Sequence, residues 1–453
     1  MANLKDSTTE IIKELTRLQT VPATHRDKDD QFPLPRMIGA GNDRSILVSK
    51  KIDDIIIVVA DQLVVQDASL STKVTSAEWR SMVRVAFGPA LATIDLDAPA
   101  EANATTVLRD VQLALTKRIA QHGVREFSFG CTLFGNSTIE SFLIGPARFE
   151  PRLDWLTRKK NDGAISETVH RRVEQIWSGK KLRKRQASMD SIREQDILDT
   201  ILGCPFVCSV TASEFGPEAG REKALTAARL ALAAIALLWS TPSRALEGMN
   251  LLFDRRVHQQ KALTFVQGKT ILAGSRLSHM PHGPWLEDGE WETLFAEQSS
   301  YFGVVGDVLS YLIDATAGGN RPAMLNAFAQ ALLWFHEGCR ESVTLMGIVK
   351  FSATLDALSC GGKSGGIKRL IAARLGIPEQ APIRPGGPTL KAAIDQIYSD
   401  GRSRTIHGTN SKLGHDWSGT EGLSEQFARL CLLACFDWAA KNPLCDDPKQ
   451  LSI

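Results

Sequence analysis

Residues 338–359 read GCRESVTLMGIVKFSATLDALS, and the spacing of their apolar side chains decides the fold class of the last third of the chain. The apolar stripe recurs every three or four positions, at Leu345, Ile348, Phe351, Leu355 and Leu358. That period matches the turn of an α-helix and differs from the alternation of a strand. Met346 and Val349 add apolar surface beside the stripe, so the segment is predicted to be a central, buried helix.

Similar helical patterns continue on both sides of this segment. They cover residues 291–316, 321–336, 365–375, 388–399 and 421–440. Strand signals stop at Trp291, and Gly- or Pro-containing stretches at 361–366 and 382–388 separate neighbouring helices. Residues 291–453 are therefore predicted to form one all-α domain.

The first 150 residues have a different pattern, which predicts a mixed α/β domain. Helices are expected at 3–19 and Thr105–Ala120, and the Val- and Ile-rich run Ile55–Val65 is expected to be a central strand. The other predicted strands are Ser45–Val48, Ala90–Leu96, Glu126–Leu133 and Ile139–Ile144. No phosphate loop and no dinucleotide fingerprint occurs in this region.

Residues 151–290 are predicted to contain a charged helical linker and a middle α/β segment. The segment has a strand at Phe206–Val210, a helix at Glu218–Ser240 and a hairpin that turns at Gln267-Gly268-Lys269. A turn-rich stretch at 279–284 is expected to mark the boundary with the helical domain. The chain is thus an α+β multidomain protein in this interpretation.

The charge balance restricts how the chain can bind nucleic acid. Its 53 basic and 51 acidic side chains give a net charge of +2, which excludes a dedicated polybasic binder. Two local basic runs remain, Arg158–Lys160 and Lys180–Arg185. The second run either binds the phosphates of a nucleic acid, which releases counterions from the nucleic acid, or forms a solvated linker or helix face. No aromatic side chains interleave with it for base stacking.

Cysteine spacing and hydropathy narrow the class of protein further. The eight cysteines form no CxxC pair and do not cluster with histidines, so no structural zinc site is expected. No cofactor is expected either. The longest apolar run, Ala224–Trp239, is interrupted by Arg229 and too short to span a bilayer. The N-terminal segment is an amphipathic helix pattern and not a secretory signal. We therefore expect a cytoplasmic protein without a membrane segment.

The candidate catalytic segment lies before the last helix. Residues 397–408 read IYSDGRSRTIHG, in which Asp400 is expected to cap a short helix and Gly408 to end it in a left-handed conformation. Arg402 and His407 lie five positions apart and are not neighbours on an ideal α-helix. They are expected to reach a shared surface, especially if a second copy faces them across a two-fold axis.

This pair of side chains suits the cleavage of RNA by its own 2′-OH. The unperturbed pKa of histidine allows it to take the 2′-OH proton near neutral pH. Arginine supplies a permanently charged, bidentate fork for the charge that accumulates on the phosphate oxygens. Such a reaction requires no metal ion, and the sequence contains no carboxylate cluster or His/Cys cage.

A helical domain that ends in Tyr-x-x-x-Arg-Ser-x-x-x-His-Gly before a long last helix resembles the HEPN superfamily, with its Arg-x(4–6)-His signature. The form RSRTIHG is most similar to the ApeA-type HEPN domains of antiphage and abortive-infection proteins. The resemblance covers roughly residues 291–445 and implies a metal-independent endoribonuclease that binds RNA and dimerises through this domain. It implies that Arg402 and His407 are catalytic, with Tyr398, Ser403 and Arg404 as supporting contacts to RNA.

The sequence departs from the family pattern at two positions. Many active members have Asn, His or Asp after the arginine, where this chain has Ser403, and toxins silenced by tyrosine nucleotidylation carry His-x-Tyr, where this chain has Thr409. A second Arg-x(5)-His pair, Arg276 and His282, lies beside two prolines and is interpreted as a surface loop.

Three functions therefore stay open at the level of sequence. The first is an RNA-cleaving defence effector whose N-terminal region senses a phage-derived or nucleotide trigger. The second is a catalytically silent HEPN adaptor that binds RNA or protein, and the third is a ligand-binding regulator that uses its helices only to dimerise. In the silent case, His407 is a helix-end residue stabilised by the helix dipole and Arg402 is solvated.

Overall fold

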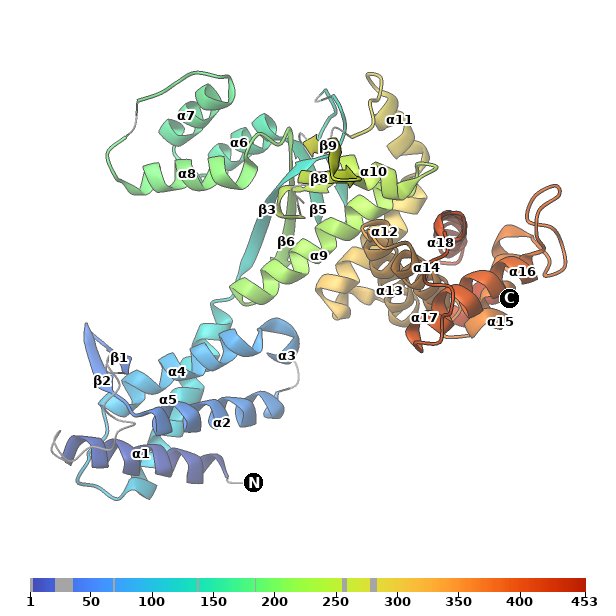
Figure 1. Ribbon diagram of the computed structural model, residues 1–453. Helices are drawn as coiled ribbons and strands as arrows, with labels where there is room; N and C mark the ends of the chain where they lie inside the picture. The colour runs from blue at the N-terminus through green and yellow to red at the C-terminus, as the bar shows by residue number, and fades with distance from the viewer. Residues whose placement is uncertain are drawn as a thin grey trace. The chain divides into compact units, whose positions relative to one another are not determined.

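The computed structural model describes residues 3–20, 36–67, 70–136, 138–183, 185–254, 259–277 and 283–453. Two compact units are present, and the chain passes between them more than once. The first contains residues 1–125 and 212–223, and the second contains 126–211 and 224–453 (Figure 1). The division falls after Arg125 and not at residue 150 or residue 290, where the sequence pattern predicts boundaries.

The first unit is helical and not mixed α/β. Its helices are α1 (Leu4–Thr20), α2 (Lys50–Gln66), α3 (Leu70–Lys73), α4 (Ser76–Ala92) and α5 (Ala100–Ala120). A small antiparallel hairpin of β1 (Met37–Gly41) and β2 (Arg44–Leu47) completes it. The predicted helices at 3–19 and Thr105–Ala120 and the strand at Ser45–Val48 are confirmed to within a few residues.

The prediction of a central strand at Ile55–Val65 is wrong, because this run lies inside helix α2. Ser49 caps the helix by accepting a hydrogen bond from the Ile52 amide. The helix buries one face at three- and four-residue spacing, through Ile52, Ile56, Val59 and Leu63. Val58 on the other face is 47% exposed. The predicted strand Ala90–Leu96 is also wrong, since it begins in helix α4 and continues without strand structure.

The second unit is built around a five-stranded sheet in the order β4-β5-β6-β3-β7. The strands are β3 (Val124–Thr132), β4 (Phe142–Ile144), β5 (Ala147–Pro151), β6 (Phe206–Ser213) and β7 (Asn250–Leu251). Strand β5 pairs with β6 in antiparallel register, with Phe149 opposite Cys208. The sheet therefore continues across the boundary expected at residue 150. The predicted strands near 126–133 and 206–210 lie in this sheet, whereas only the last three residues of the predicted strand Ile139–Ile144 do.

Among the described residues, five helices of this unit lie between the strands of the sheet in the chain order. They are α6 (Arg152–Asn161), α7 (Glu167–Trp177), α8 (Met189–Ile201), α9 (Pro217–Ala236) and α10 (Pro242–Gly248). Helices α6, α7 and α8 share a small apolar core that includes Trp155, Val169 and Val173. A hairpin of β8 (Gln259–Val266) and β9 (Lys269–Leu277) follows the short helix η3 (Leu252–Asp254). Its turn falls at Gln267-Gly268, as predicted, and both residues have positive φ.

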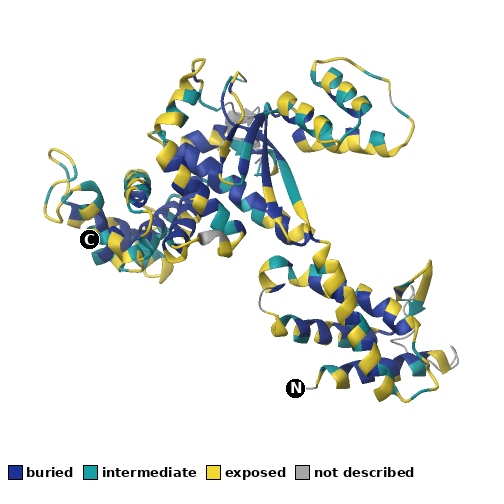
Figure 2. Ribbon diagram, turned by 180° about the vertical axis from the view of Figure 1, so that it is seen from behind, coloured by how far each residue is buried: buried dark blue, intermediate teal, exposed yellow. Residues whose placement is uncertain are grey.

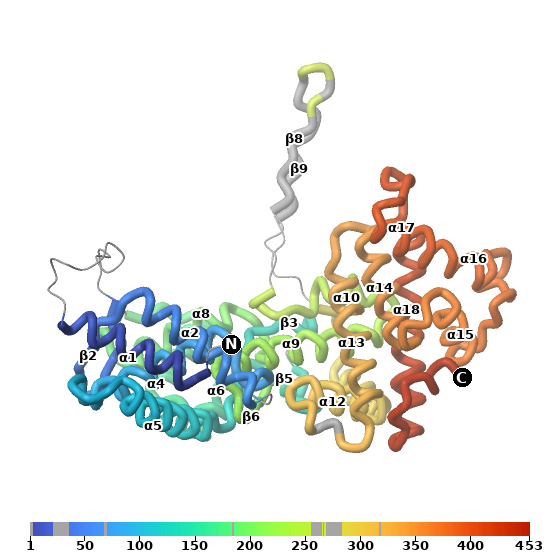
Figure 3. The backbone as a smooth tube through the Cα atoms, turned by 90° about the horizontal axis from the view of Figure 1, so that it is seen from below, coloured from blue at the N-terminus to red at the C-terminus, as the bar shows by residue number. Residues whose placement is uncertain are grey.

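Residues 290–453 are helical, as the sequence predicts. The elements are α11 (Glu290–Glu297), α12 (Ser299–Ile313), η4 (Ala315–Gly318), α13 (Pro322–Cys339), α14 (Thr344–Leu358), α15 (Lys363–Leu375), α16 (Leu390–Ile394), η5 (Asp395–Ser403), α17 (Arg404–Ile406), α18 (Ser418–Lys441) and η6 (Pro448–Ser452). Helix α14 contacts both α13 and α18 (Figure 3). Its predicted stripe is buried, because Ile348, Phe351 and Leu355 are each at most 1% exposed.

These helices join the sheet in one unit and do not form a domain of their own. The Trp291 ring lies 4.9 Å from the ring of Phe142 on β4 and 4.8 Å from that of Phe134. The Tyr301 hydroxyl donates a hydrogen bond to the Ala234 carbonyl on α9. Buried residues run from the sheet into helices α12, α13 and α14 in Figure 2. In the described part of the chain, no helix has the length and hydropathy to cross a membrane.

Candidate functional site

The candidate segment is wound as a π-helix. Helix α16 starts at the capping residue Thr389, whose side chain accepts a hydrogen bond from the Ala392 amide, and passes directly into η5. Asp400 lies inside η5, so the prediction that it caps a new helix is wrong. Gly408 adopts φ +68° and ends the element, as predicted. π-helical turns are rare and occur frequently at functional sites.

A close approach to helix α14 fixes the π-helix against the core. A Cβ atom on Gly401 would lie 2.7 Å from the Ile348 side chain, which is closer than such atoms come in proteins. Glycine at 401 therefore allows α14 and η5 to pack together. The next residue, Arg402, lies beside Asp356 in the C-terminal half of α14.

Two side chains contact Arg402, which is only partly exposed to solvent. Its Nη1 donates a hydrogen bond of 3.1 Å to the Tyr398 hydroxyl, and its guanidinium carbon lies 4.8 Å from the centre of the Tyr398 ring. Its Nη2 lies 3.6 Å from a carboxylate oxygen of Asp356 on α14. Only 25% of the side chain is exposed, and its Nε is buried without a hydrogen bond to any described residue.

Tyr398 and Asp356 differ in how well the sequence predicts them. Tyr398, on the same turn as Arg402, is 8% exposed, and burial together with the charge of Asp356 raises the pKa of its hydroxyl. Its position four residues before the arginine makes this contact foreseeable. Asp356 lies 46 positions away in the sequence, and the local pattern contains no signal for it.

His407 is exposed and lies at the end of α17. Its backbone amide donates to the Ser403 carbonyl at 3.0 Å, while its imidazole makes no hydrogen bond or ion pair with any residue the structure describes. No such contact joins it to Arg402. Arg404 forms an ion pair of 3.1 Å with Asp400. The structure thus brings Arg402 and Tyr398 together, and leaves His407, Ser403 and Arg404 without side-chain contact to Arg402.

A cavity of about 400 Å³ lies on another face of the same π-helix. Its lining residues come from α16, η5 and the loop before α18: Ala392, Asp395, Gln396, Ser399, Asp400, Lys412, His415, Asp416 and Trp417. The lining contains three carboxylates, of Asp395, Asp400 and Asp416, and one lysine. Neither Arg402 nor His407 lines it.

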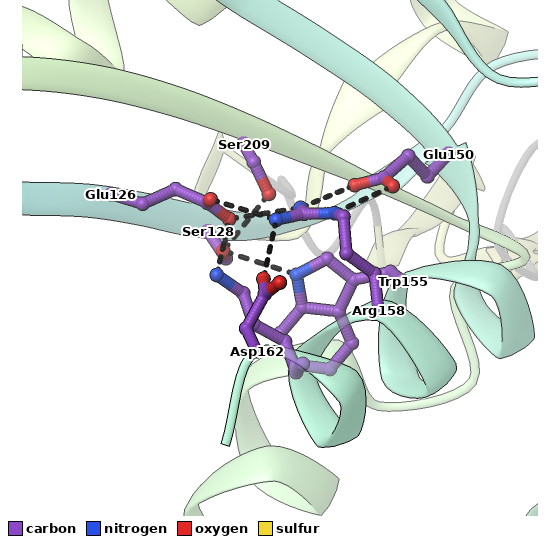
Figure 4. A network of polar contacts seen from close by, with 8 residues as sticks. Glu126, Ser128, Glu150, Trp155, Arg158, Asp162 and Ser209 are labelled. Atoms are coloured by element: carbon purple, nitrogen blue, oxygen red, sulfur yellow. Dashed lines mark hydrogen bonds and ion pairs between the residues drawn. The ribbon is translucent and has the colours of Figure 1, made fainter. Parts of the chain in front are cut away.

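The first basic run is neutralised inside the fold (Figure 4). Arg158 donates to Glu126 at 2.9 Å and to Glu150 at 2.8 Å, and Lys159 pairs with Glu126 at 2.8 Å. Burial opposes ionisation of Glu126, but hydrogen bonds from Arg158 and Lys159 outweigh it and lower its pKa to about 2. Arg158 and Lys159 therefore join α6 to the sheet, and their charges are compensated by these carboxylates.

The other Arg–His pair is not placed by the structure. Arg276 lies on β9, whereas His279 and His282 are outside the described residues. Elsewhere, the described residues include no group of three or more His, Cys, Asp or Glu side chains arranged to hold a metal ion. Comparison of the chain with protein-family models, with curated proteins and with solved structures found no match.

Proposed function

We propose that the chain is a metal-independent endoribonuclease of the HEPN type that acts as an antiphage or abortive-infection effector. The observation that supports this most is the setting of Arg402. Its guanidinium is oriented by Tyr398 and Asp356 at the end of a π-helix, five residues before an exposed histidine. A side chain held in this way keeps its charge in one place, which transition-state stabilisation requires.

In the proposed reaction, the 2′-OH of RNA attacks the adjacent phosphorus, and the bond from phosphorus to the 5′-oxygen of the next nucleotide breaks. His407 takes the 2′-OH proton, and a second acid gives a proton to the leaving oxygen. The products end in a 2′,3′-cyclic phosphate and a 5′-OH. Arg402 binds the non-bridging oxygens, since its Nη2 is beyond hydrogen-bond distance from Asp356 and keeps donors for a phosphate.

A homodimer would complete this site. One protomer offers a single histidine in the segment, whereas the reaction needs both a base and an acid. A two-fold axis beside α17 would bring a second His407 and a second Arg402 to the same phosphate. Light scattering of the purified protein should therefore give the mass of a dimer at micromolar concentration.

A catalytically silent adaptor is the second candidate function. It is favoured by the absence of contact between His407 and Arg402 and by the Ser403 side chain, which makes no hydrogen bond with the described residues. In this case the chain would bind RNA or a protein without cutting it.

Purified protein incubated with total RNA in EDTA separates these functions. Wild type should cut the RNA, and His407→Ala should lose about 10²–10⁴-fold in rate while it keeps the wild-type melting temperature. An RNA with 2′-deoxyribose at the cut site should resist cleavage, because it lacks the nucleophile. Cleavage of that substrate at the normal rate, or inhibition by EDTA, would contradict the mechanism. No cleavage of any RNA by wild type would favour the adaptor.

A further inference from the structure

The two basic runs of the chain have opposite surroundings. The first run is paired with carboxylates beside the sheet, as described above. The second run lies in the loop 178–188 between α7 and α8 (Figure 1). Its Lys180, Lys181 and Arg183 are exposed, and none of them forms an ion pair with any residue in the described part of the chain. Lys184 lies outside the described residues.

One buried carboxylate holds this loop in place. Glu194 on α8 is 8% exposed and accepts hydrogen bonds of 2.8 and 3.1 Å from Arg172 on α7. Arg172 also donates to the backbone carbonyl of Arg183 at 3.1 Å, and Arg185 lies 3.6 Å from Glu194. The loop is thus fixed near Arg183 by its carbonyl and at Arg185 by its side chain.

The cations in and beside this loop have two different roles. Arg172 and Arg185 hold the loop, while the three exposed cations form no ion pair with a carboxylate among the residues that the structure describes. A loop fixed in advance loses less conformational entropy when it binds a ligand. Three unpaired charges within four residues also attract a polyanion more strongly than the balanced net charge of the chain suggests.

We propose that Lys180, Lys181 and Arg183 of this loop bind the phosphate backbone of single-stranded RNA, independently of base sequence, at a place other than the Arg402 segment. The choice of RNA as the polyanion rests on the proposed function. No aromatic side chain lies in 178–188 to stack on bases, so the contacts would be electrostatic. An anionic bilayer is disfavoured, because the only leucine of the loop, Leu182, is half-buried and not available for insertion.

The test measures binding without cleavage. Full-length protein carrying His407→Ala is titrated into a fluorescein-labelled 30-nucleotide polyuridine, and anisotropy is recorded at several NaCl concentrations. Adding Lys180→Gln, Lys181→Gln and Arg183→Gln should weaken binding at low salt by tenfold or more. The slope of log K against log salt should also fall in magnitude by about 2, because single strands release about 0.7 counterion per phosphate contact.

A matched variant controls for net charge. Arg44→Gln, Lys50→Gln and Lys117→Gln remove three exposed cations from the first unit, and binding should stay within twofold of the His407→Ala parent. The proposal is overturned if the loop variant and this control variant bind polyuridine equally well, whether or not both bind it more weakly than the parent. Binding of the loop variant and its parent to phosphatidylserine vesicles is measured as well. The proposal is also overturned if the loop variant binds polyuridine like its parent and loses only its binding to the vesicles. Because the readout is binding, the inference can hold when wild type fails to cut RNA, and it can fail when wild type cuts.

Discussion

The Arg402 guanidinium stacks on the Tyr398 ring at 4.8 Å and also donates a hydrogen bond to the hydroxyl of that tyrosine. The two residues lie four positions apart on a π-helix, and Asp356 contacts the same guanidinium from α14. These contacts therefore orient the arginine in the absence of a substrate. Two substitutions separate the charge of this arginine from its orientation.

Arg402→Lys should severely reduce RNA cleavage, because an ammonium keeps the charge and loses the bidentate fork. Tyr398→Phe keeps the ring and removes only the hydroxyl acceptor, so kcat/KM should fall about fivefold, as expected for a lost hydrogen bond of about 1 kcal/mol. Tyr311→Phe on α12 is the matched control, since its hydroxyl makes no hydrogen bond with the described residues. Equal effects of the two tyrosine variants would show that Tyr398 does not orient Arg402.

Glu421 at the start of α18 should make stability depend on pH near neutrality. Burial, followed by the charges of Glu425 and Glu341, raises its pKa to about 7. The folded state then binds more protons than the unfolded state between about pH 4.5 and 7. Stability should accordingly fall as the pH rises through this window.

Glu421→Gln removes this titration. Its melting temperature at pH 8 should exceed that of wild type by about 2–4 °C, which corresponds to about 1 kcal/mol for a carboxyl partly screened by solvent. At pH 5 the two proteins should melt at nearly the same temperature. A variant that is less stable than wild type at pH 8 would refute the assignment. Glu10→Gln, on the exposed surface of the first unit, is the control.

Local sequence patterns predict the helical last third well and the first unit poorly, for a physical reason. In α14 the apolar residues occupy one face, so the periodicity reports burial directly. In α2 the run Ile55–Val59 is apolar on both faces, and Ile57 and Val58 stay exposed. β-Branched residues favour a strand locally, and packing against the other helices outweighs that preference.

Local sequence patterns also predict only part of the candidate site. Arg402, Tyr398 and His407 follow from residues close together in the sequence. The contact between Asp356 and Arg402 depends on α14 and η5 lying side by side, which no local pattern specifies. The π-helical winding of η5 cannot be predicted from the local sequence either, because the same residues fit an α-helix.

Glu78 should be important for the stability of the first unit, because it caps two helices. Its carboxylate accepts from the Thr75 amide at 3.0 Å in the capping box of α4. It also accepts from the backbone amides of Glu218 and Ala219 at the start of α9. Burial disfavours its charge, but these amides outweigh burial and lower its pKa.

Glu78→Ala should therefore destabilise the protein by about 1–3 kcal/mol in urea unfolding at pH 7. A carboxyl with a depressed pKa stabilises the fold above its unfolded pKa, and this contribution is lost as the pH falls through the folded pKa. The difference between wild type and Glu78→Ala should consequently shrink below about pH 4. A difference that is constant from pH 7 to pH 3 would argue against capping by the ionised carboxylate.

Arg158 is predicted to contribute more than any other cation of the first basic run. It bridges Glu126, which is 23% exposed in its side chain, and Glu150, which is 3% exposed. Arg158→Met preserves the apolar stem and removes the charge, so both carboxylates lose their main partner. Breaking a buried ion pair in this way typically costs about 3–5 kcal/mol.

The adjacent Lys160 provides the control, because its partner Glu167 is 72% exposed and 3.5 Å away. Lys160→Met should change the free energy of unfolding by less than about 1 kcal/mol. The double variant Glu126→Gln, Arg158→Met should recover part of the loss, since it leaves one ionised carboxylate fewer without a partner. If Arg158→Met and Lys160→Met unfold at the same urea concentration, the network in Figure 4 does not stabilise the sheet.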